Sequence, residues 1–134
     1  MHRLQPGMRS SHTYRADAER LADRYGNPGV RVLATPHLVS LLETECLSCV
    51  GGRLDPGQST VGTRVDVRHL AATPEGMSFT ITAELAEIDR RRLVFNVEAR
   101  DETEVVMTGT HERFIVETAP FLAKAAAKRS SATP

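Results

Sequence analysis

The sequence of 134 residues has no tryptophan, only 4% aromatic residues, two cysteines and no net charge. Six phenylalanines and tyrosines leave few side chains to stack on nucleic-acid bases or flat cofactors. Lys+Arg and Asp+Glu number 17 each, so the accumulated positive charge that binds phosphate backbones is missing. We therefore expect no nucleic-acid partner and no cofactor.

Long apolar runs are also missing. No segment approaches the ~20 apolar residues that span a bilayer, and the first residues, MHRLQPG, contain no apolar stretch typical of a signal peptide. We expect a soluble, cytoplasmic protein with no membrane partner. The length corresponds to one domain, so we predict a single domain over residues 1–134 in which 130–134 form a disordered tail.

The two cysteines have C-x-x-C spacing. Cys46 and Cys49 fall near the end of an apolar helical stretch, whereas a redox pair normally opens a helix. We interpret both as buried thiols that pack like small hydrophobic residues. One such pair also offers too few ligands for zinc, and we predict no metal site.

A long helix is predicted between Thr35-Pro36 and Gly51-Gly52. A threonine N-cap followed by proline at the first helical position starts a helix, and glycines end it. Because its outer face carries small hydroxyl residues instead of long charged ones, we expect this helix to be enclosed nearly all round. Its apolar face consists of Leu38, Val39, Leu42, Cys46, Cys49 and Val50, and its outer face carries Ser40, Thr44 and Ser48.

Beyond a turn at residues 55–57 the apolar pattern changes to the period of two that is typical of strands. Four strands are predicted, with inward residues Val61, Thr63, Val65, Val67 and His69 in the first, Phe79, Ile81, Ala83 and Leu85 in the second, Leu93, Phe95, Val97 and Ala99 in the third, and a fourth over 104–117. Shorter elements are predicted at 11–15 (strand), 17–25 (helix capped by Asp17, with Leu21, Ala22 and Tyr25 inward) and 120–128 (helix).

This order predicts an α+β fold in which an antiparallel β-sheet wraps around a long central helix. Edge strands of such a small sheet need covering or pairing. We therefore expect a homodimer.

Two glutamates interrupt the apolar helix. Glu43 lies towards the edge of the apolar arc, and a carboxylate is costly to bury unless it is paired or hydrogen-bonded. We favour a functional role for Glu43; the alternative is that it reaches solvent or pairs with a structural arginine. Glu45, at the other edge of the arc, is interpreted as structural.

His69 closes the first predicted strand on the inward side. A lone inward histidine is more often a hydrogen-bonded core residue than a catalyst, but a carboxylate such as Glu43 nearby would orient and charge-stabilise the imidazole. Thr35 either caps the helix or belongs to a site at its N-terminus, where free N–H groups polarise a carbonyl. Since Pro36 has no N–H, the donors would be those of His37 and Leu38.

Segment 62–77 reads GTRVDVRHLAATPEGM, 80–85 reads TITAEL and 109–113 reads GTHER. Together with Ala34-Thr35 and the helix that bears Glu43, these segments resemble the fluoroacetyl-CoA thioesterase family of hot-dog proteins over roughly residues 30–128. The resemblance implies a hot-dog dimer that hydrolyses acyl-CoA thioesters through Thr35, Glu43 and His69. It also implies that Gly62 and Arg113 position the substrate, Gly62 by letting the backbone approach the thioester and Arg113 by holding a carboxylate or phosphate.

We therefore predict an acyl-CoA thioesterase in which His69 is the general base and acid. Thr35 is either the nucleophile or the group that holds the attacking water. Two alternatives remain: a non-catalytic protein that binds acyl-CoA or an acyl ligand, in which Glu43 and His69 are a structural pair, and a hot-dog hydratase or dehydratase. The fluoroacetyl-specific member of the family has phenylalanines before the helix, but residues 26–33 contain no aromatic residue, which predicts a different acyl group.

Overall fold

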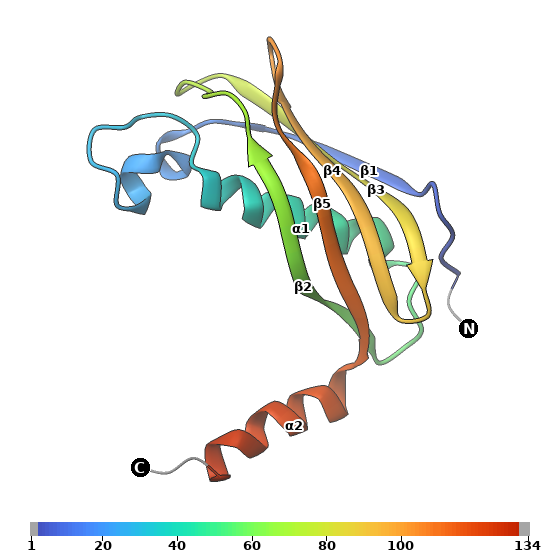
Figure 1. Cartoon of the computed structure of the whole chain (residues 1–134). Helices are drawn as coiled ribbons and strands as arrows, with labels where there is room; N and C mark the ends of the chain where they lie inside the picture. The colour runs from blue at the N-terminus through green and yellow to red at the C-terminus, as the bar shows by residue number, and fades with distance from the viewer. Residues whose placement is uncertain (1–2, 132–134) are drawn as a thin grey trace.

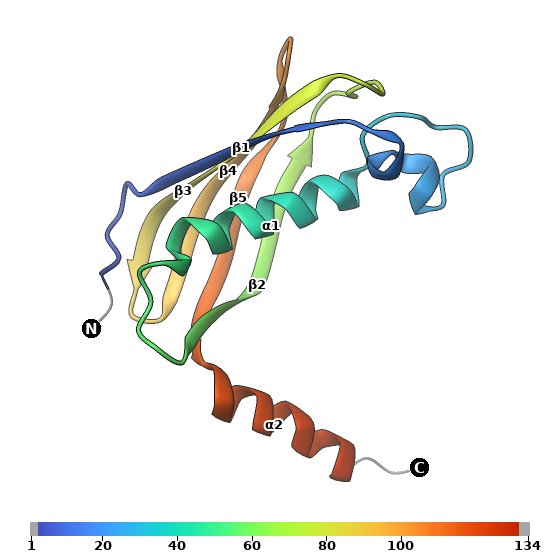
Figure 2. The ribbon, with the colours of Figure 1, turned by 180° about the vertical axis from the view of Figure 1, so that it is seen from behind.

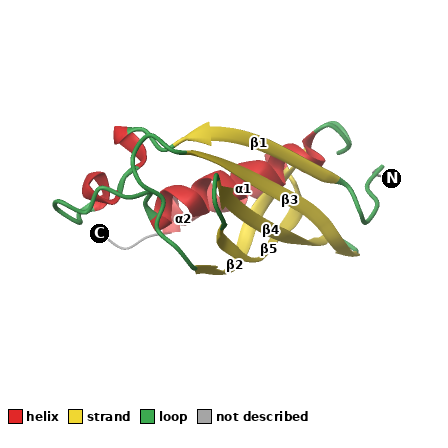
Figure 3. Ribbon diagram, turned by 90° about the horizontal axis from the view of Figure 1, so that it is seen from above, coloured by secondary structure: helices red, strands yellow, loops and turns green. Residues whose placement is uncertain are grey.

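The computed structural model describes residues 3–131. One antiparallel sheet, with strand order β1-β3-β4-β5-β2, curves around the helix α1 (Figures 1 and 3). This arrangement confirms the predicted α+β fold with a sheet wrapped around a long helix. The elements are β1 (Arg9–Arg15), α1 (Thr35–Gly51), β2 (Gln58–His69), β3 (Ser78–Asp89), β4 (Arg92–Asp101), β5 (Val105–Glu117) and α2 (Thr118–Ser131).

The core lies between α1 and the face of the sheet that it covers. Side chains of β3 and β4 alternate between this core and the outer face, as the period of two predicts. The eight inward residues predicted for these two strands, Phe79, Ile81, Ala83, Leu85, Leu93, Phe95, Val97 and Ala99, are all buried. Burial of each large apolar side chain contributes roughly 1.5–3 kcal/mol, so these strands hold α1 in place.

Helix α1 has the predicted length, but Thr35 does not cap it. Ala34 occupies the N-cap position, Thr35 is the first helical residue, and no side chain caps the helix. The prediction that the helix is enclosed nearly all round is wrong for the single chain, because the sheet covers one side only. Leu38, Leu42, Cys46 and Val50 are buried against the sheet, whereas Ser40, Thr44 and Ser48 are exposed.

Strand β2 contains an irregularity that the alternating pattern did not reveal. Its register against β5 shifts between Gly62 and Arg64, where a β-bulge places an extra residue in β2. Before the bulge, Gly62 pairs with the inward Arg113; after it, Val65 pairs with the buried His111. The predicted common face of Val61, Thr63 and Val65 is therefore wrong, because the bulge shifts the alternation by one residue.

The segment before α1 also differs from its prediction. Residues 17–25 form two 3-10 turns, Ala18–Arg20 and Ala22–Tyr25, and the Asp17 side chain caps neither. Between them the backbone of Leu21 is extended, and this buried residue makes a β-bridge with Leu33, which interrupts the helix. Tyr25, expected to point inward, is 47% exposed.

The C-terminal helix α2 extends away from the sheet (Figures 1 and 2). It begins before the predicted residue 120 and continues through Ser131, so Ser130 and Ser131 are helical and do not belong to a disordered tail. The rest of that predicted tail, residues 132–134, lies outside the described residues. Among residues 3–131, neither helix is both long and apolar enough to cross a membrane.

Both cysteines are free thiols on α1. Cys46 is completely buried in the core, and this burial raises the pKa of its thiol to about 12. Cys49 is half-buried, and desolvation raises its pKa as well. Packing as small hydrophobic residues, as predicted, accounts for both.

Gly109 and Gly52 give a matched test of how closely β2 and β5 approach. A Cβ at Gly109 would overlap the Asp66 carbonyl oxygen and lie 2.7 Å from the Val67 Cα, whereas a Cβ at Gly52 would meet nothing within 4 Å. We expect Gly109→Ala to lower the free energy of unfolding by about 1–3 kcal/mol or more. Gly52→Ala, in right-handed backbone, should leave it unchanged or raise it by up to ~1 kcal/mol. Urea denaturation at one protein concentration measures both, and equal effects would contradict the close approach.

Candidate functional site

Thr35 and His69 meet at the N-terminus of α1. The hydroxyl of Thr35 lies 2.6 Å from Nδ1 of His69, which closes β2. Sequence reasoning proposed both residues for one site, and the structure brings them together. Because Thr35 is the first residue of the helix and not its cap, its hydroxyl is free for this contact.

The imidazole of His69 is poised to accept a proton from Thr35. Desolvation by burial lowers its pKa, so the ring is neutral at neutral pH. If Nδ1 accepts the hydroxyl proton, Nε2 carries the ring hydrogen. Within residues 3–131, Nε2 is buried and has no hydrogen-bond partner. The backbone of Ala71 also interacts with the ring and raises its pKa, by less than burial lowers it.

The start of α1 also offers a backbone donor. Pro36 has no N–H, and the N–H of Leu38 donates to the Ala34 carbonyl at 3.0 Å, so the prediction that Leu38 is free is wrong. The N–H of His37 makes no such bond among the described residues. It remains the candidate for polarising a carbonyl at the positive end of the helix.

Two cavities adjoin the Thr35–His69 pair. One, of about 390 Å³, is lined by Thr35, His69 and residues 70–72. The other, of about 280 Å³, extends under the segment that precedes α1, and its walls include Val30, Val32 and Leu33. A small ligand at this helix N-terminus would have room on both sides.

A second cluster forms further along α1. Oε2 of Glu43, which is 40% exposed, lies 3.7 Å from Nη1 of Arg113 and 3.7 Å from Nε2 of His111. A Cβ at Gly62 would lie 2.6 Å from the same carboxylate oxygen. Glycine at position 62 therefore lets the carboxylate of Glu43 approach the paired strands β2 and β5, and a larger side chain there would make it shift. The carboxylate that faces Arg113 in this chain is that of Glu43 itself.

Arg113 is held on three sides. Its Nε donates to the Thr60 hydroxyl at 2.7 Å, Nη2 to the Thr60 carbonyl at 2.9 Å, and Nη1 lies 3.1 Å from Nε2 of His111. Nδ1 of His111 lies 2.8 Å from the Arg64 carbonyl, to which it donates, so Nε2 is left as the acceptor for Arg113. Burial lowers the pKa of His111, which supports this neutral form.

Thr60 and His111 were not predicted as site residues. His111 is inside the GTHER segment, but an isolated histidine in a strand gives no indication of its partner across the sheet. The predicted alternation placed Val61 inward and Thr60 on the outer face, so no pattern in the sequence pointed to Thr60. Both residues orient the guanidinium towards Glu43.

The expected contact between Glu43 and His69 is not present in one chain. Eight residues of helix separate Glu43 from Thr35, about 12 Å at 1.5 Å per residue. Among the described residues, Glu43 is within ion-pair distance of Arg113 and lies beside the neutral His111. The alternative that Glu43 pairs with an arginine therefore describes the single chain. The six predicted residues divide into Thr35, His37 and His69 in one cluster and Glu43, Gly62 and Arg113 in the other.

Glu45 has the structural environment expected of it. Its buried carboxylate contacts the Ser10 hydroxyl and lies 2.7 and 2.9 Å from Nδ1 of His12. Both partners belong to β1. The contacts tie this edge strand to α1 and satisfy a charge that would otherwise be costly to bury.

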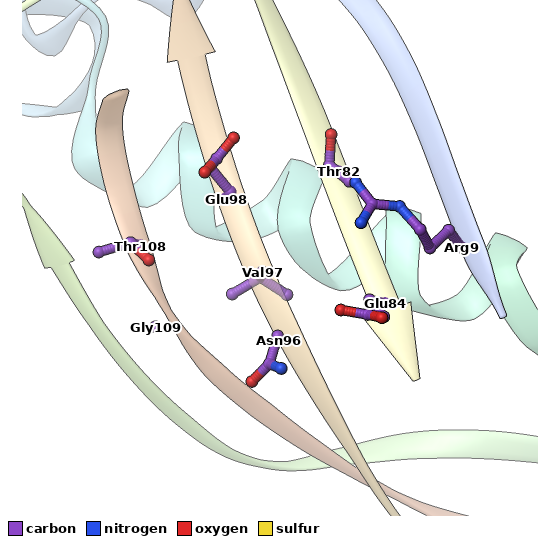
Figure 4. Close-up of a pocket in the computed structure, with 8 residues that line it drawn as sticks. All are labelled: Arg9, Thr82, Glu84, Asn96, Val97, Glu98, Thr108 and Gly109. Carbon is purple, nitrogen blue, oxygen red and sulfur yellow. The ribbon is translucent and has the colours of Figure 1, made fainter. Parts of the chain in front are cut away.

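The outer face of the sheet carries a polar hollow of about 220 Å³ that contains none of the predicted site residues (Figure 4). It is lined by Arg9, Thr82, Glu84, Asn96, Val97, Glu98, Thr108 and Gly109. In the part of the chain that the structure describes, no group of three or more His, Cys, Asp or Glu is arranged to hold a metal ion.

Comparison with known proteins identifies the family. The model of the fluoroacetyl-CoA-specific thioesterase family matches residues 16–119. The chain belongs to this family. It is 41% identical to the fluoroacetyl-CoA thioesterase of Streptantibioticus cattleyicolor over 93 residues, which cover 69% of this chain and 67% of that relative. The predicted family is thereby confirmed.

Solved structures of the fluoroacetyl-CoA-specific thioesterase agree in fold over nearly the whole chain. One has a TM-score of 0.86 and 33% identity and covers 98% of both chains. A threonine-to-serine variant in complex with acetyl-CoA has a TM-score of 0.87 and 32% identity over 93% of this chain and 98% of that one. A thioesterase superfamily member from Thermus thermophilus, 22% identical, has a TM-score of 0.90 over 98% of this chain and 97% of that one and shows the fold.

Replacing His111 tests how Arg113 is held. His111→Asn keeps a donor for the Arg64 carbonyl but withdraws the acceptor from Arg113, whereas His111→Gln reaches Arg113 with its carbonyl oxygen. We expect His111→Asn to lose about 1–3 kcal/mol more unfolding free energy than His111→Gln, because it leaves a buried charged donor unpaired.

The same variants have a predicted pH dependence. Since the pKa of His111 is lowered in the folded protein, the unfolded chain binds more protons, and stability falls as the pH drops below about 6.5. Urea denaturation of His111→Gln should show a shallower fall than the native protein. Equal slopes would mean that His111 is not neutral in the fold.

Proposed function

We propose that this protein hydrolyses acyl-CoA thioesters to a free acid and CoA, at sites that two copies of the chain form together. Membership of the fluoroacetyl-CoA-specific thioesterase family supports thioester hydrolysis and an acyl-CoA substrate. The observation that carries the proposal is the contact of 2.6 Å between Thr35 and His69 at a helix N-terminus. At this point the hydroxyl of Thr35, the neutral imidazole of His69 and the backbone N–H of His37 lie at the start of one helix.

In this proposal the N–H of His37 polarises the thioester carbonyl, and His69 takes a proton from Thr35 or from water. Thr35 either attacks the carbonyl carbon or holds the attacking water. In the first case the C–S bond breaks, CoA leaves as a thiol with the proton from His69, and water then releases the acid from an acyl-threonine. In the second case water attacks directly.

A partner subunit completes the site. Among the described residues His69 has no carboxylate partner, and Glu43, which faces Gly62 of β2 and Arg113 of β5, stays half-exposed. Strand β2 has an unpaired edge, with residues 62–66 exposed. Antiparallel pairing of β2 with a second copy would place the His69 end of one strand beside the Gly62 half of the other, where Glu43 and Arg113 lie.

This arrangement assigns the remaining predicted residues. Glu43 of the partner subunit lies beside the Thr35–His69 pair and stabilises the charged form of His69. Arg113, fixed by Thr60 and His111, holds that carboxylate in place. Gly62 keeps the space between them open, and a small acyl group enters the 280 Å³ cavity beside Thr35.

Release of free thiol from a panel of acyl-CoAs tests the activity and its residues. We expect His69→Ala to lower kcat/KM by ~10²–10⁴-fold, and Thr35→Ala and Glu43→Gln to lower it strongly, while His12→Ala changes little. Intact mass spectra of quenched reactions would show acyl-Thr35 if threonine is the nucleophile.

The outcomes separate the alternatives. Full activity of His69→Ala would overturn the residue assignment but leave the enzyme class standing. If no acyl-CoA releases thiol, the protein binds acyl-CoA without hydrolysing it.

Mixing two inactive variants tests the shared site. In a heterodimer of His69→Ala and Glu43→Gln, a shared site receives an intact His69 from one subunit and an intact Glu43 from the other. Random mixing would then restore about a quarter of the native rate, because half of the dimers have one intact site of two. If both residues act within one chain, mixing restores nothing. Sedimentation of the native protein checks that it is dimeric.

A further inference from the structure

Tyr25 lines the same 280 Å³ cavity as Thr35 and His69, yet neither the family motifs nor the proposed reaction assigns it a role. It ends the second 3-10 turn, Ala22–Tyr25, and its hydroxyl lies 2.7 Å from Nδ1 of His37. The question is which of these two atoms donates the hydrogen.

Arg20 decides it. Nε of Arg20 donates to Nε2 of His37 at 3.1 Å, and a guanidinium has no acceptor atom. Nε2 is therefore the acceptor nitrogen of a ring whose single hydrogen is on Nδ1. Burial and the nearby charge of Arg20 lower the pKa of His37, in agreement with a neutral ring. His37 thus donates to the Tyr25 oxygen, and the hydroxyl hydrogen of Tyr25 stays free for another acceptor.

This chain of donors is anchored at its start. Nη1 of Arg20 donates to the Arg15 carbonyl at 2.7 Å, and the guanidinium carbon lies 5.2 Å from the centre of the Tyr14 ring. Arg20 therefore has few ways to turn away from His37. The direction of the Tyr25 hydroxyl is set before any ligand arrives.

The surface of the cavity is about evenly polar and apolar, although six of its ten lining residues are apolar. Apart from Tyr25, Asn27, Thr35 and His69, the lining consists of Ala22, Val30, Val32, Leu33, Ala34 and Pro36. An acyl chain that enters this space would meet the free O–H of the half-exposed Tyr25 on the same wall as Val30, Val32 and Leu33. A donor in such surroundings favours a ligand that carries an acceptor over one that does not.

We propose that Tyr25 donates a hydrogen bond to an oxygen on the acyl chain, so that the site selects acyl-CoAs with a carbonyl or hydroxyl group beyond the thioester over plain alkyl chains. This proposal rests on the proposed thioesterase function. It makes Tyr25 a specificity-determining residue and His37 the group that directs its hydroxyl.

Acetoacetyl-CoA, 3-hydroxybutyryl-CoA and butyryl-CoA have the same chain length and differ only in the oxygen at C3. We expect the native protein to have a higher kcat/KM for the two oxygenated substrates, and Tyr25→Phe to lower the ratio of oxygenated to plain substrate by about five- to tenfold. Tyr14→Phe, which removes the hydroxyl of the other tyrosine, is the matched control. A ratio in Tyr25→Phe that stays within twofold of the native value would overturn the proposal.

A binding experiment separates this proposal from the proposed function. Calorimetry in the His69→Ala background measures the affinity for the same three thioesters without turnover, alone and combined with Tyr25→Phe. A loss of preference for the oxygenated ligands on removal of the Tyr25 hydroxyl supports the subsite even if the native protein hydrolyses none of them. Equal affinities for all three ligands in the presence of Tyr25 would refute it.

Discussion

The β-bulge in β2 is the constraint on which both halves of the site depend. Gly62 and His69 are seven residues apart, and a regular strand would turn residues at an odd separation to opposite faces of the sheet. The extra residue between Gly62 and Arg64 restores the common face. Gly62 can then make room for Glu43 while His69 reaches Thr35. A strand without the bulge could satisfy one of these contacts but not both.

Two carboxylates on α1 show how surroundings decide the role of a residue. Glu45 is buried, and Ser10 and His12 of β1 satisfy it completely, so it fastens an edge strand to the helix. Glu43, two residues earlier, faces a guanidinium that Thr60 and His111 already hold in place, and it stays half-exposed. The carboxylate of Glu45 is enclosed by its partners, whereas that of Glu43 keeps lone pairs available for another donor. In the proposed shared site, this available carboxylate stabilises the histidine of a partner subunit.

The helices and strands could be predicted from the sequence better than the contacts between them. The inward residues of β3 and β4 and the extent of α1 follow from periodicity and from the glycine and proline signals, because these are local properties of the chain. The bulge at Gly62, the bridge that divides residues 17–25, and the clamp of Thr60 and His111 on Arg113 depend on contacts between distant segments. No local pattern encodes these. Thr35 and His69 were candidates because one starts the helix and the other closes a strand on its inward side. The pairing assumed for Glu43 depended on a distance between separate elements, which periodicity does not give.

The buried thiols of α1 have a consequence for a protein whose proposed product is itself a thiol. Free CoA forms mixed disulfides with cysteines that are accessible and ionised, since the thiolate is the attacking species. With a pKa of about 12 and no exposed surface, Cys46 is almost entirely protonated at neutral pH and out of reach. The half-buried Cys49 has a raised pKa as well. The C-x-x-C pair is therefore a poor target for covalent capture by the coenzyme that each turnover would release.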